Sequence, residues 1–278
     1  MNSALLPTSP DDLATQSAFW TFVAVQWGQA PGAGFVLWLL TVAATALPLC
    51  TFMQRNSAIR RPLQAPLGHS AIAWTLLAAT LWSTLAWQVA HGGPVTRLDT
   101  ALAHTLSLHV PPALLAFFGT VSHLADTPVL TIACIVGAVA LIWRGERQMA
   151  AGWVWAIAGN ALLNVMLKHW IGRVRPEHVE GYTMAGGLSF PSGHSSGSLV
   201  AYGMLAWILL QLHPGWPCRL RAAVLTLAAL VVAAVGYSRI GLQVHYLSDV
   251  LGGWLSGSVW LAGSVGLVRA LEHRKTAS

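Results

Sequence analysis

Residues 127–143 read TPVLTIACIVGAVALIW, an apolar stretch without one charged side chain. A helix needs about 20 apolar residues to cross a bilayer, with roughly 17 to 25 the usual range. Moving outward along the chain, further uncharged apolar stretches of similar length occupy residues 33–53, 72–90, 149–167, 195–212, 222–237 and 250–268. The sequence therefore predicts an all-α protein, a polytopic bundle of seven membrane-spanning helices.

The composition excludes two other classes of protein. Of the 278 residues, 55% are hydrophobic and only 9% are charged, whereas a soluble globular domain carries about 25% charged residues. Disorder is excluded by the high apolar content. The formal net charge of +6 would suggest nucleic acid on a soluble protein. In a membrane protein it is a topology signal, and we expect no nucleic-acid partner.

The cationic residues predict the orientation of the chain, because Lys and Arg are retained on the cytoplasmic side of a membrane. Ten of the fifteen lie in alternate connections or at the C-terminus: Arg55, Arg60, Arg61, Arg144, Arg147, Arg219, Arg221, Arg269, Arg274 and Lys275. An odd number of spans then places the N-terminus outside. The remaining five fall on the outer side: Arg97, Lys168, Arg173, Arg175 and Arg239. Cations on that side need a reason other than topology.

The stretch 91–126 predicts two short helices between the second and third spans. Leu98, Leu102 and Leu106 recur at helical spacing, and Pro111 and Pro112 interrupt the chain before the apolar residues 113–124. We expect both helices to lie in the membrane interface. There they would either cap the bundle or line an entrance for lipid.

Three polar stretches stand out on the predicted outer face, and the first follows the fourth span. Lys168 stands at the end of that span, and Arg175 precedes Pro176, which ends the helix. A fixed guanidinium beside a flexible ammonium group suits a phosphate. Interfacial anchoring of the helix is the alternative.

The second stretch, Pro191-Ser192-Gly193-His194, directly precedes the fifth span. Ser192 or Gly193 can cap the helix, whose free N–H groups and positive dipole end attract an anion. Gly193 allows close approach to the backbone, and His194 can exchange a proton. A simple polar cap remains the alternative.

The third stretch joins the sixth and seventh spans, with Ser238-Arg239 followed by His245 and Asp249. The last two are four residues apart, so on a helix they share one face. A carboxylate on one imidazole nitrogen fixes the tautomer and leaves the other nitrogen as a nucleophile or base.

A zinc site is the competing interpretation, because His194, His245 and Asp249 offer two imidazoles and a carboxylate. Cations in the same place would repel a divalent metal, and the sequence predicts three of them there: Lys168, Arg175 and Arg239. We therefore expect neither a metal nor another cofactor. Cations, an anion-binding helix start and a His–Asp pair together indicate phosphoryl transfer.

These residues resemble a known family signature. Lys168-x6-Arg175-Pro176, Pro191-Ser192-Gly193-His194 and Ser238-Arg239-x5-His245-x3-Asp249 are similar in order and spacing to the three motifs of the type 2 phosphatidic acid phosphatase (PAP2) superfamily. The resemblance covers about residues 72–268, or six spans. It implies a phosphatase core at 69–270, preceded by an additional span and basic loop at 1–68 and followed by a basic tail at 271–278.

The resemblance also implies a mechanism and a location. His245 would attack phosphorus to form a phosphohistidine, with Asp249 orienting the ring and His194 protonating the leaving group. The phosphate oxygens would be held by Lys168, Arg175, Ser192, Gly193 and Arg239. The family works without a metal, and its membrane branch implies a bacterial inner membrane protein whose active site faces the periplasm.

The expected activity is hydrolysis of a lipid phosphate or diphosphate, with undecaprenyl diphosphate, phosphatidic acid, phosphatidylglycerol phosphate and lipid A phosphates as candidates. Three alternatives remain: phosphoryl transfer to a lipid acceptor, a phospholipid carrier or flippase, and a vanadate-dependent haloperoxidase. The oligomeric state is left open. Several neighbouring residues could tune substrate choice, although ordinary solvation or helix capping is the preferred interpretation: Arg173, Glu177, Glu180, Ser238 and Tyr246.

Overall fold

The protein is a bundle of α-helices in the part of the chain that the structure, a computed structural model, describes: residues 10–55, 69–176 and 186–277. No strand occurs in those ranges, which confirms the all-α prediction. The helices are α1 (Pro10–Gln29), α2 (Pro31–Arg55), α3 (His69–Ala90), α4 (Pro94–His109), α5 (Pro112–Ser122), the 3-10 turn η1 (His123–Ala125), α6 (Thr127–Trp143), α7 (Arg147–Ile171), α8 (Gly193–Leu212), α9 (Cys218–Gly241) and α10 (Leu247–Ala277).

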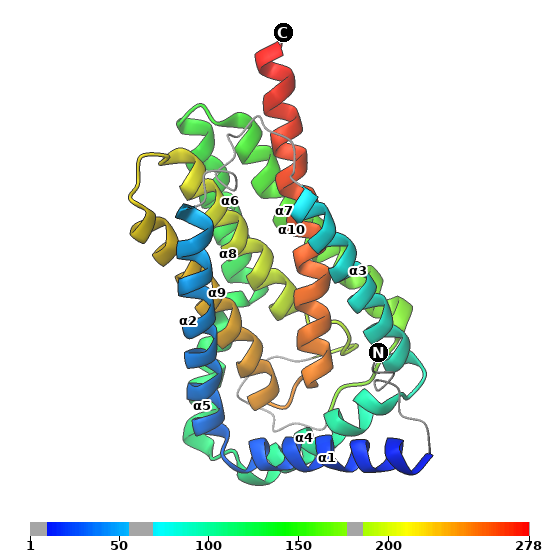
Figure 1. The fold of residues 1–278 in the computed structure, drawn as a ribbon. Helices are drawn as coiled ribbons and strands as arrows, with labels where there is room; N and C mark the ends of the chain where they lie inside the picture. Colours follow the sequence, from blue (N-terminus) through cyan, green and yellow to red (C-terminus); the bar gives the residue numbers. More distant parts are fainter. Residues whose placement is uncertain (1–9, 56–68, 177–185, 278) are drawn as a thin grey trace, which may run out of the picture.

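Seven apolar helical stretches in the described residues are long enough to cross a membrane, which confirms the predicted number. They correspond to α2, α3, α6, α7, α8, α9 and α10, and they stand side by side in Figure 1. The third stretch runs from Pro112 to Trp143 and includes α5 and η1. The short predicted span 222–237 is extended at both ends in α9.

Helix α1 was not predicted from the sequence. It lies across one end of the bundle beside α4 (Figure 1). Ala24 of α1 packs in a cluster with Leu102 and Leu106 of α4. The two helices touch at Gly28, where a Cβ atom would come within 2.7 Å of the Thr105 Cβ. Helix α1 therefore depends on the leucine face of α4, a contact that no local pattern reveals.

The first span, α2, packs along α9. Phe35 of α2 and Phe118 of α5 join Tyr237 of α9 in one buried aromatic cluster. The Tyr237 hydroxyl donates a hydrogen bond to the Pro31 carbonyl oxygen (2.9 Å). The start of α2 and the end of α9 therefore lie at the same end of the bundle, as the alternating topology predicts.

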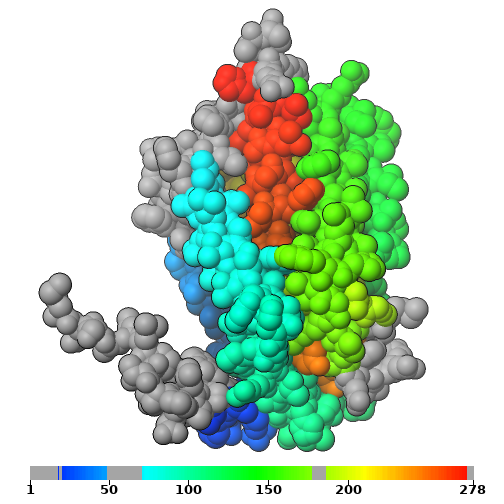
Figure 2. All heavy atoms as spheres, turned by 90° about the vertical axis from the view of Figure 1, so that its right-hand side faces the viewer, coloured from blue at the N-terminus to red at the C-terminus, as the bar shows by residue number. Residues whose placement is uncertain are grey.

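Helix α10 is central, packed against α8, α3 and α7; Figure 2 shows α3 in cyan in front of α10. Gly253 of α10 lies against the N-cap residue of α8, because a Cβ atom there would lie 2.6 Å from the Ser192 carbonyl oxygen. Because Gly253 has no side chain, the N-terminal ends of α8 and α10 come together. This contact sets the position of the polar residues at both helix starts.

Candidate active site

The structure brings the three polar stretches together at one end of the bundle. The end of α7, the start of α8, the end of α9 and the start of α10 meet there. The backbone joins two of them directly, because the Ser192 N–H donates to the Asp249 carbonyl oxygen (2.9 Å). Arg144, in the connection between α6 and α7, and Arg219, in the first turn of α9, lie at the other ends of these helices.

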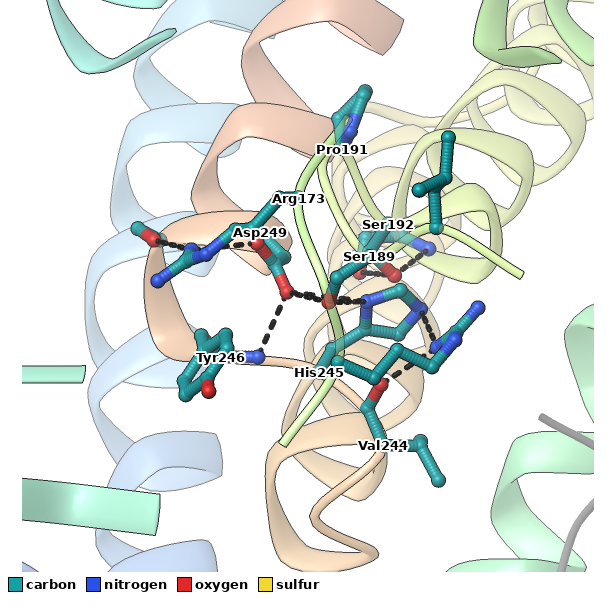
Figure 3. A network of polar contacts seen from close by, with 12 residues as sticks. Arg173, Ser189, Pro191, Ser192, Val244, His245, Tyr246 and Asp249 are labelled. Atoms are coloured by element: carbon teal, nitrogen blue, oxygen red, sulfur yellow. Dashed lines mark hydrogen bonds and ion pairs between the residues drawn. The ribbon is translucent and has the colours of Figure 1, made fainter. Parts of the chain in front are cut away.

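His245 lies in the turn before α10 rather than on the helix, which begins at Leu247. The predicted pairing with Asp249 is still present, since its Nδ1 is 3.3 Å from the Asp249 Oδ2. On the other side of the ring, the Arg175 Nη1 donates to the His245 Nε2 (3.0 Å; Figure 3). These partners fix the tautomer: Nδ1 carries the proton and the Nε2 lone pair faces the arginine.

His245 is almost completely buried. This burial lowers the pKa of His245 well below its ordinary value, even though Asp249 raises it, and the charges of Arg175 and Arg239 lower it further. The imidazole is therefore neutral at neutral pH. A neutral ring with a free lone pair is the form that can attack phosphorus.

Asp249 is held from three sides. Its Oδ1 accepts a hydrogen bond from the Arg173 Nη1 (2.8 Å), and its Oδ2 accepts from the Tyr246 N–H (2.9 Å). The Ser189 hydroxyl donates to the same Oδ2 and lies 3.3 Å from the His245 Nδ1 (Figure 3). Asp249 thus has a fixed direction, and so has the imidazole that it contacts.

Arg173 corrects one expectation, because it is a largely buried ion-pair partner, with a side chain only 11% exposed, rather than a solvated loop residue. Its guanidinium bridges Asp249 and Asp99, each at 2.8 Å, and its Cζ lies 4.0 Å from the centre of the Tyr246 ring. Asp99, on α4, is buried and also accepts from the Ser248 N–H (3.0 Å). Burial raises the pKa of Asp99, and Arg173 counters part of that effect.

Asp99 and Ser189 were not predicted from the sequence. Asp99 had a signal, since its spacing from Leu102 and Leu106 places it on the buried face of α4. A carboxylate there needs a cationic partner. Ser189 had no such signal, because a serine in a loop is ordinary.

Two further predictions concerned residues near the site. The Ser238 hydroxyl donates to its own helix at the Val235 carbonyl (2.7 Å), while residues 177 and 180 lie outside the described ranges.

The predicted phosphate-binding cations surround the same place. The Lys168 ammonium donates to the carbonyl oxygens of Leu188 and Ser189. Arg175 donates to the Val244 carbonyl (2.6 Å) as well as to the imidazole. The Arg239 Nη1 donates to the Ser122 hydroxyl. The acceptors of these hydrogen bonds are uncharged, and three cations in one place favour an anion.

The start of α8 carries the remaining predicted residues. Ser192 caps the helix, with its Oγ accepting from the Ser195 N–H (3.4 Å). Gly193 lies against α7, where a Cβ atom would be 3.0 Å from the Asn164 Oδ1. The His194 Nε2 donates to the Oδ1 of Asp126 (2.8 Å), a residue that was not predicted to belong to the site.

A mostly apolar cavity of about 470 Å³ begins at Gly193 and His194 and extends between α6, α7 and α8. Its walls include Leu130, Cys134 and Ile157. The cavity is not lined by α4 or by α5. Within the described ranges, no group of three or more His, Cys, Asp or Glu side chains is placed to hold a metal ion.

Comparison with known proteins supports the resemblance. The PAP2 superfamily model matches residues 150–272. Phosphatidylglycerophosphatase B of Bacillus subtilis (strain 168) is 31% identical over 60% of this chain and 81% of its own length. The decaprenylphosphoryl-5-phosphoribose phosphatase of Mycobacterium tuberculosis is 30% identical over 53% of this chain and 76% of its own. The crystal structure of the transmembrane PAP2 type phosphatidylglycerolphosphate phosphatase from Bacillus subtilis has a TM-score of 0.62 and 27% identity, covering 72% of this chain and 96% of that one.

Proposed function

The chain belongs to the PAP2 superfamily, and we propose that it hydrolyses a lipid phosphate or diphosphate through a phosphohistidine on His245. The observation that carries this proposal is the two-sided contact of the imidazole. Asp249 holds Nδ1 at 3.3 Å, and the Nε2 lone pair faces the Arg175 guanidinium at 3.0 Å. A phosphate bound by Arg175 would present its phosphorus to Nε2.

The reaction follows from these positions. Phosphate oxygens replace backbone and imidazole partners on Lys168, Arg175 and Arg239, with the N-terminal end of α8 at Ser192 and Gly193 as a further anion site. The Nε2 of His245 attacks phosphorus as the bond to the leaving oxygen breaks.

His194 donates a proton to the leaving oxygen, and then accepts one from the water that hydrolyses the phosphohistidine. Asp249 stays ionised throughout and stabilises the positive charge that develops on the His245 ring. The cycle consumes one water and needs no cofactor.

The substrate is a lipid because an apolar cavity begins at the catalytic end of the site. The cavity between α6, α7 and α8 would accept part of a hydrocarbon chain, while the phosphate lies among the cations. Undecaprenyl diphosphate, phosphatidic acid, phosphatidylglycerol phosphate and lipid A phosphates all share this chemistry. The described residues of the site favour none of these head groups over the others.

The PAP2 core is proposed to extend over residues 69–270, with residues 1–68 as an addition and 271–278 as a tail. We place the protein in a bacterial inner membrane with the site facing the periplasm. The reason is charge: Arg144, in the connection between α6 and α7, and Arg219, in the first turn of α9, lie at the end of the bundle away from the site, and cations at that end of the spans are retained in the cytoplasm.

The test is phosphate release by the purified protein in detergent over a panel of the four lipid classes. We expect release from at least one lipid, and a loss of roughly 10³-fold or more for His245→Ala because the nucleophile is removed. His169→Ala is the matched control, since this exposed imidazole hydrogen-bonds, among the described residues, to the Val165 carbonyl of its own helix. It should leave the rate unchanged.

The same purified protein, assayed in detergent for phosphate release and in lipid vesicles for transport, separates the alternatives. Phosphate release in the absence of an acceptor lipid excludes obligatory phosphoryl transfer. A carrier would move lipid between leaflets even as His245→Ala, whereas a phosphatase loses its reaction. Bromide oxidation after addition of vanadate would indicate a haloperoxidase and contradict the proposal.

A further inference from the structure

The Asp126 side chain lies at a helix N-terminus but does not cap that helix. It is the N-cap residue of α6, where an aspartate usually accepts a hydrogen bond from a free N–H of the first turn. The Asp126 side chain makes no such bond. Its Oδ1 contacts the His194 Nε2 at 2.8 Å, and its Oδ2 contacts the His123 Nδ1 at 2.6 Å. The carboxylate is thus directed at imidazoles rather than at its own helix.

The contact with His194 determines which ring nitrogen is available. When Nε2 donates its proton to Asp126, the imidazole is held in one orientation and Nδ1 is left for the substrate. This is the arrangement by which a carboxylate orients a catalytic histidine in hydrolases. We infer that Asp126 is the positioning residue of the general acid, holding the His194 imidazole so that Nδ1 delivers the proton to the leaving oxygen.

Charge balance supports the same role. A protonated His194 adds a positive charge to a site that already holds three cations: Lys168, Arg175 and Arg239. Two of these, Arg175 and Arg239, are close enough to act electrostatically on His194. The Asp126 carboxylate supplies a compensating negative charge at hydrogen-bond distance. Without it, the imidazole would be protonated only against the repulsion of its neighbours.

The proton that His194 gives to the leaving group in the first step is returned to it in the second. As the phosphorus–oxygen bond breaks, the Nδ1 proton of His194 moves to the leaving oxygen and the ring becomes neutral. Water then attacks the phosphohistidine, the nitrogen–phosphorus bond breaks, and a water proton returns to Nδ1. Asp126 keeps its negative charge throughout, and the His194 Nε2 keeps its own proton, which it donates in the hydrogen bond to the Asp126 Oδ1. With side-chain exposures of 20% for His194 and 30% for Asp126, the pair has access to water.

This inference rests on the proposed function, and its test uses the leaving group. General acid catalysis matters most when the leaving oxygen is strongly basic, as in the alkoxide of phosphatidic acid. It matters little for p-nitrophenyl phosphate, whose phenolate leaves without a proton. We therefore compare kcat/KM for the two substrates in Asp126→Asn. The expected loss is roughly 10- to 100-fold on phosphatidic acid and under about threefold on p-nitrophenyl phosphate.

Three variants complete the experiment. His194→Ala should show the same selectivity as Asp126→Asn with a larger loss on phosphatidic acid. Asp126→Glu should recover part of that loss, because the carboxylate is retained. The matched control is Glu146→Gln, since Glu146 is also an N-cap residue without a side-chain cap bond, at the start of α7. It should change neither substrate.

The outcomes separate the two claims. Equal losses on both substrates in Asp126→Asn, or no loss on phosphatidic acid, would overturn the positioning role even if His194→Ala is selective. A non-selective His194→Ala would remove His194 as the acid and Asp126 with it, while leaving the nucleophile untouched. If the unaltered protein releases no phosphate from any lipid, the proposed function itself fails.

Discussion

Two histidine–aspartate pairs lie in the same site and differ in depth. His245 and Asp249 are buried, with a long contact of 3.3 Å and an aspartate held from three sides. His194 and Asp126 are partly exposed, with a shorter contact of 2.8 Å beside the cavity. The difference matches the proposed tasks. A nucleophile gains from a fixed, neutral ring, whereas a general acid must exchange protons with water in every cycle.

The buried pair of His245 and Asp249 is also supported by two further charged residues. Behind Asp249 stands Arg173, and behind Arg173 stands Asp99 on α4, so the nucleophile is tied to a helix that lies across the end of the bundle (Figure 1). Behind Asp126 stands only the exposed His123 among the contacts of its carboxylate in the described residues. The deep pair should therefore respond more strongly to mutation.

The largest expected effect is that of Asp249→Asn. The neutral amide cannot stabilise the positive charge that develops on the His245 ring, so kcat should fall by roughly 10²- to 10⁴-fold. KM for the lipid should change little, because the phosphate cations are untouched. Steady-state kinetics in detergent checks both values. A variant with full kcat would contradict the orienting role of Asp249.

The next effect is that of Arg173→Ala. Removing the guanidinium leaves two buried carboxylates facing each other, which costs about 3–5 kcal/mol of folding free energy. The melting temperature should fall clearly, and kcat should fall with it because Asp249 loses its 2.8 Å partner. A thermal melt followed by assay at low temperature separates the two losses. Arg173→Lys keeps one charge and should recover stability only in part, because ammonium cannot bridge both carboxylates in the same geometry.

A smaller effect is expected for Asp99→Asn, about two- to tenfold in kcat, since the amide still accepts the Ser248 N–H and removes only one ion pair from Arg173. The double variant with Arg173→Lys provides a coupling measurement. If the two losses simply add, Asp99 and Arg173 do not act as a unit.

The smallest effect concerns pH. A lowered pKa keeps His245 neutral as the pH falls through about 6.5, the ordinary histidine value. The nucleophile should therefore lose less than about twofold of kcat/KM between pH 7.5 and 6.5. The free energy of unfolding should depend on pH more strongly than the rate does. In the unfolded chain the His245 imidazole is protonated below about pH 6.5, whereas in the folded protein it stays neutral, so stability falls as the pH drops below about 6.5. A pH–rate profile with an acid limb centred at 6.5 or higher would contradict the buried, neutral ring.

The sequence predicted the fold well because membrane spans are specified locally. Seven uncharged stretches, such as 127–143 and 250–268, became α6 and α10, since a helix that crosses a bilayer must satisfy its backbone hydrogen bonds within itself. Helix α1 was missed because its formation depends on packing with α4 through Gly28 and Thr105. That contact joins residues far apart in the chain.

The motifs of the candidate site were equally visible in the sequence, because phosphate chemistry limits the choice to cations, imidazoles and helix starts. What supports them was not visible. Arg173 looked like a loop charge, and Asp99, Asp126 and Ser189 belong to no motif. They reach the site across 74, 68 and 60 residues of separation, from Asp99 to Arg173, from Asp126 to His194 and from Ser189 to Asp249.

The sequence alone thus determined the number of spans, their alternation and the chemical groups available to a phosphate, since hydropathy and motif spacing are local properties. Only the tertiary structure decided which carboxylate holds which imidazole, and how deeply each pair is buried. The reason is that a buried charge is tolerated only where distant segments supply its partner.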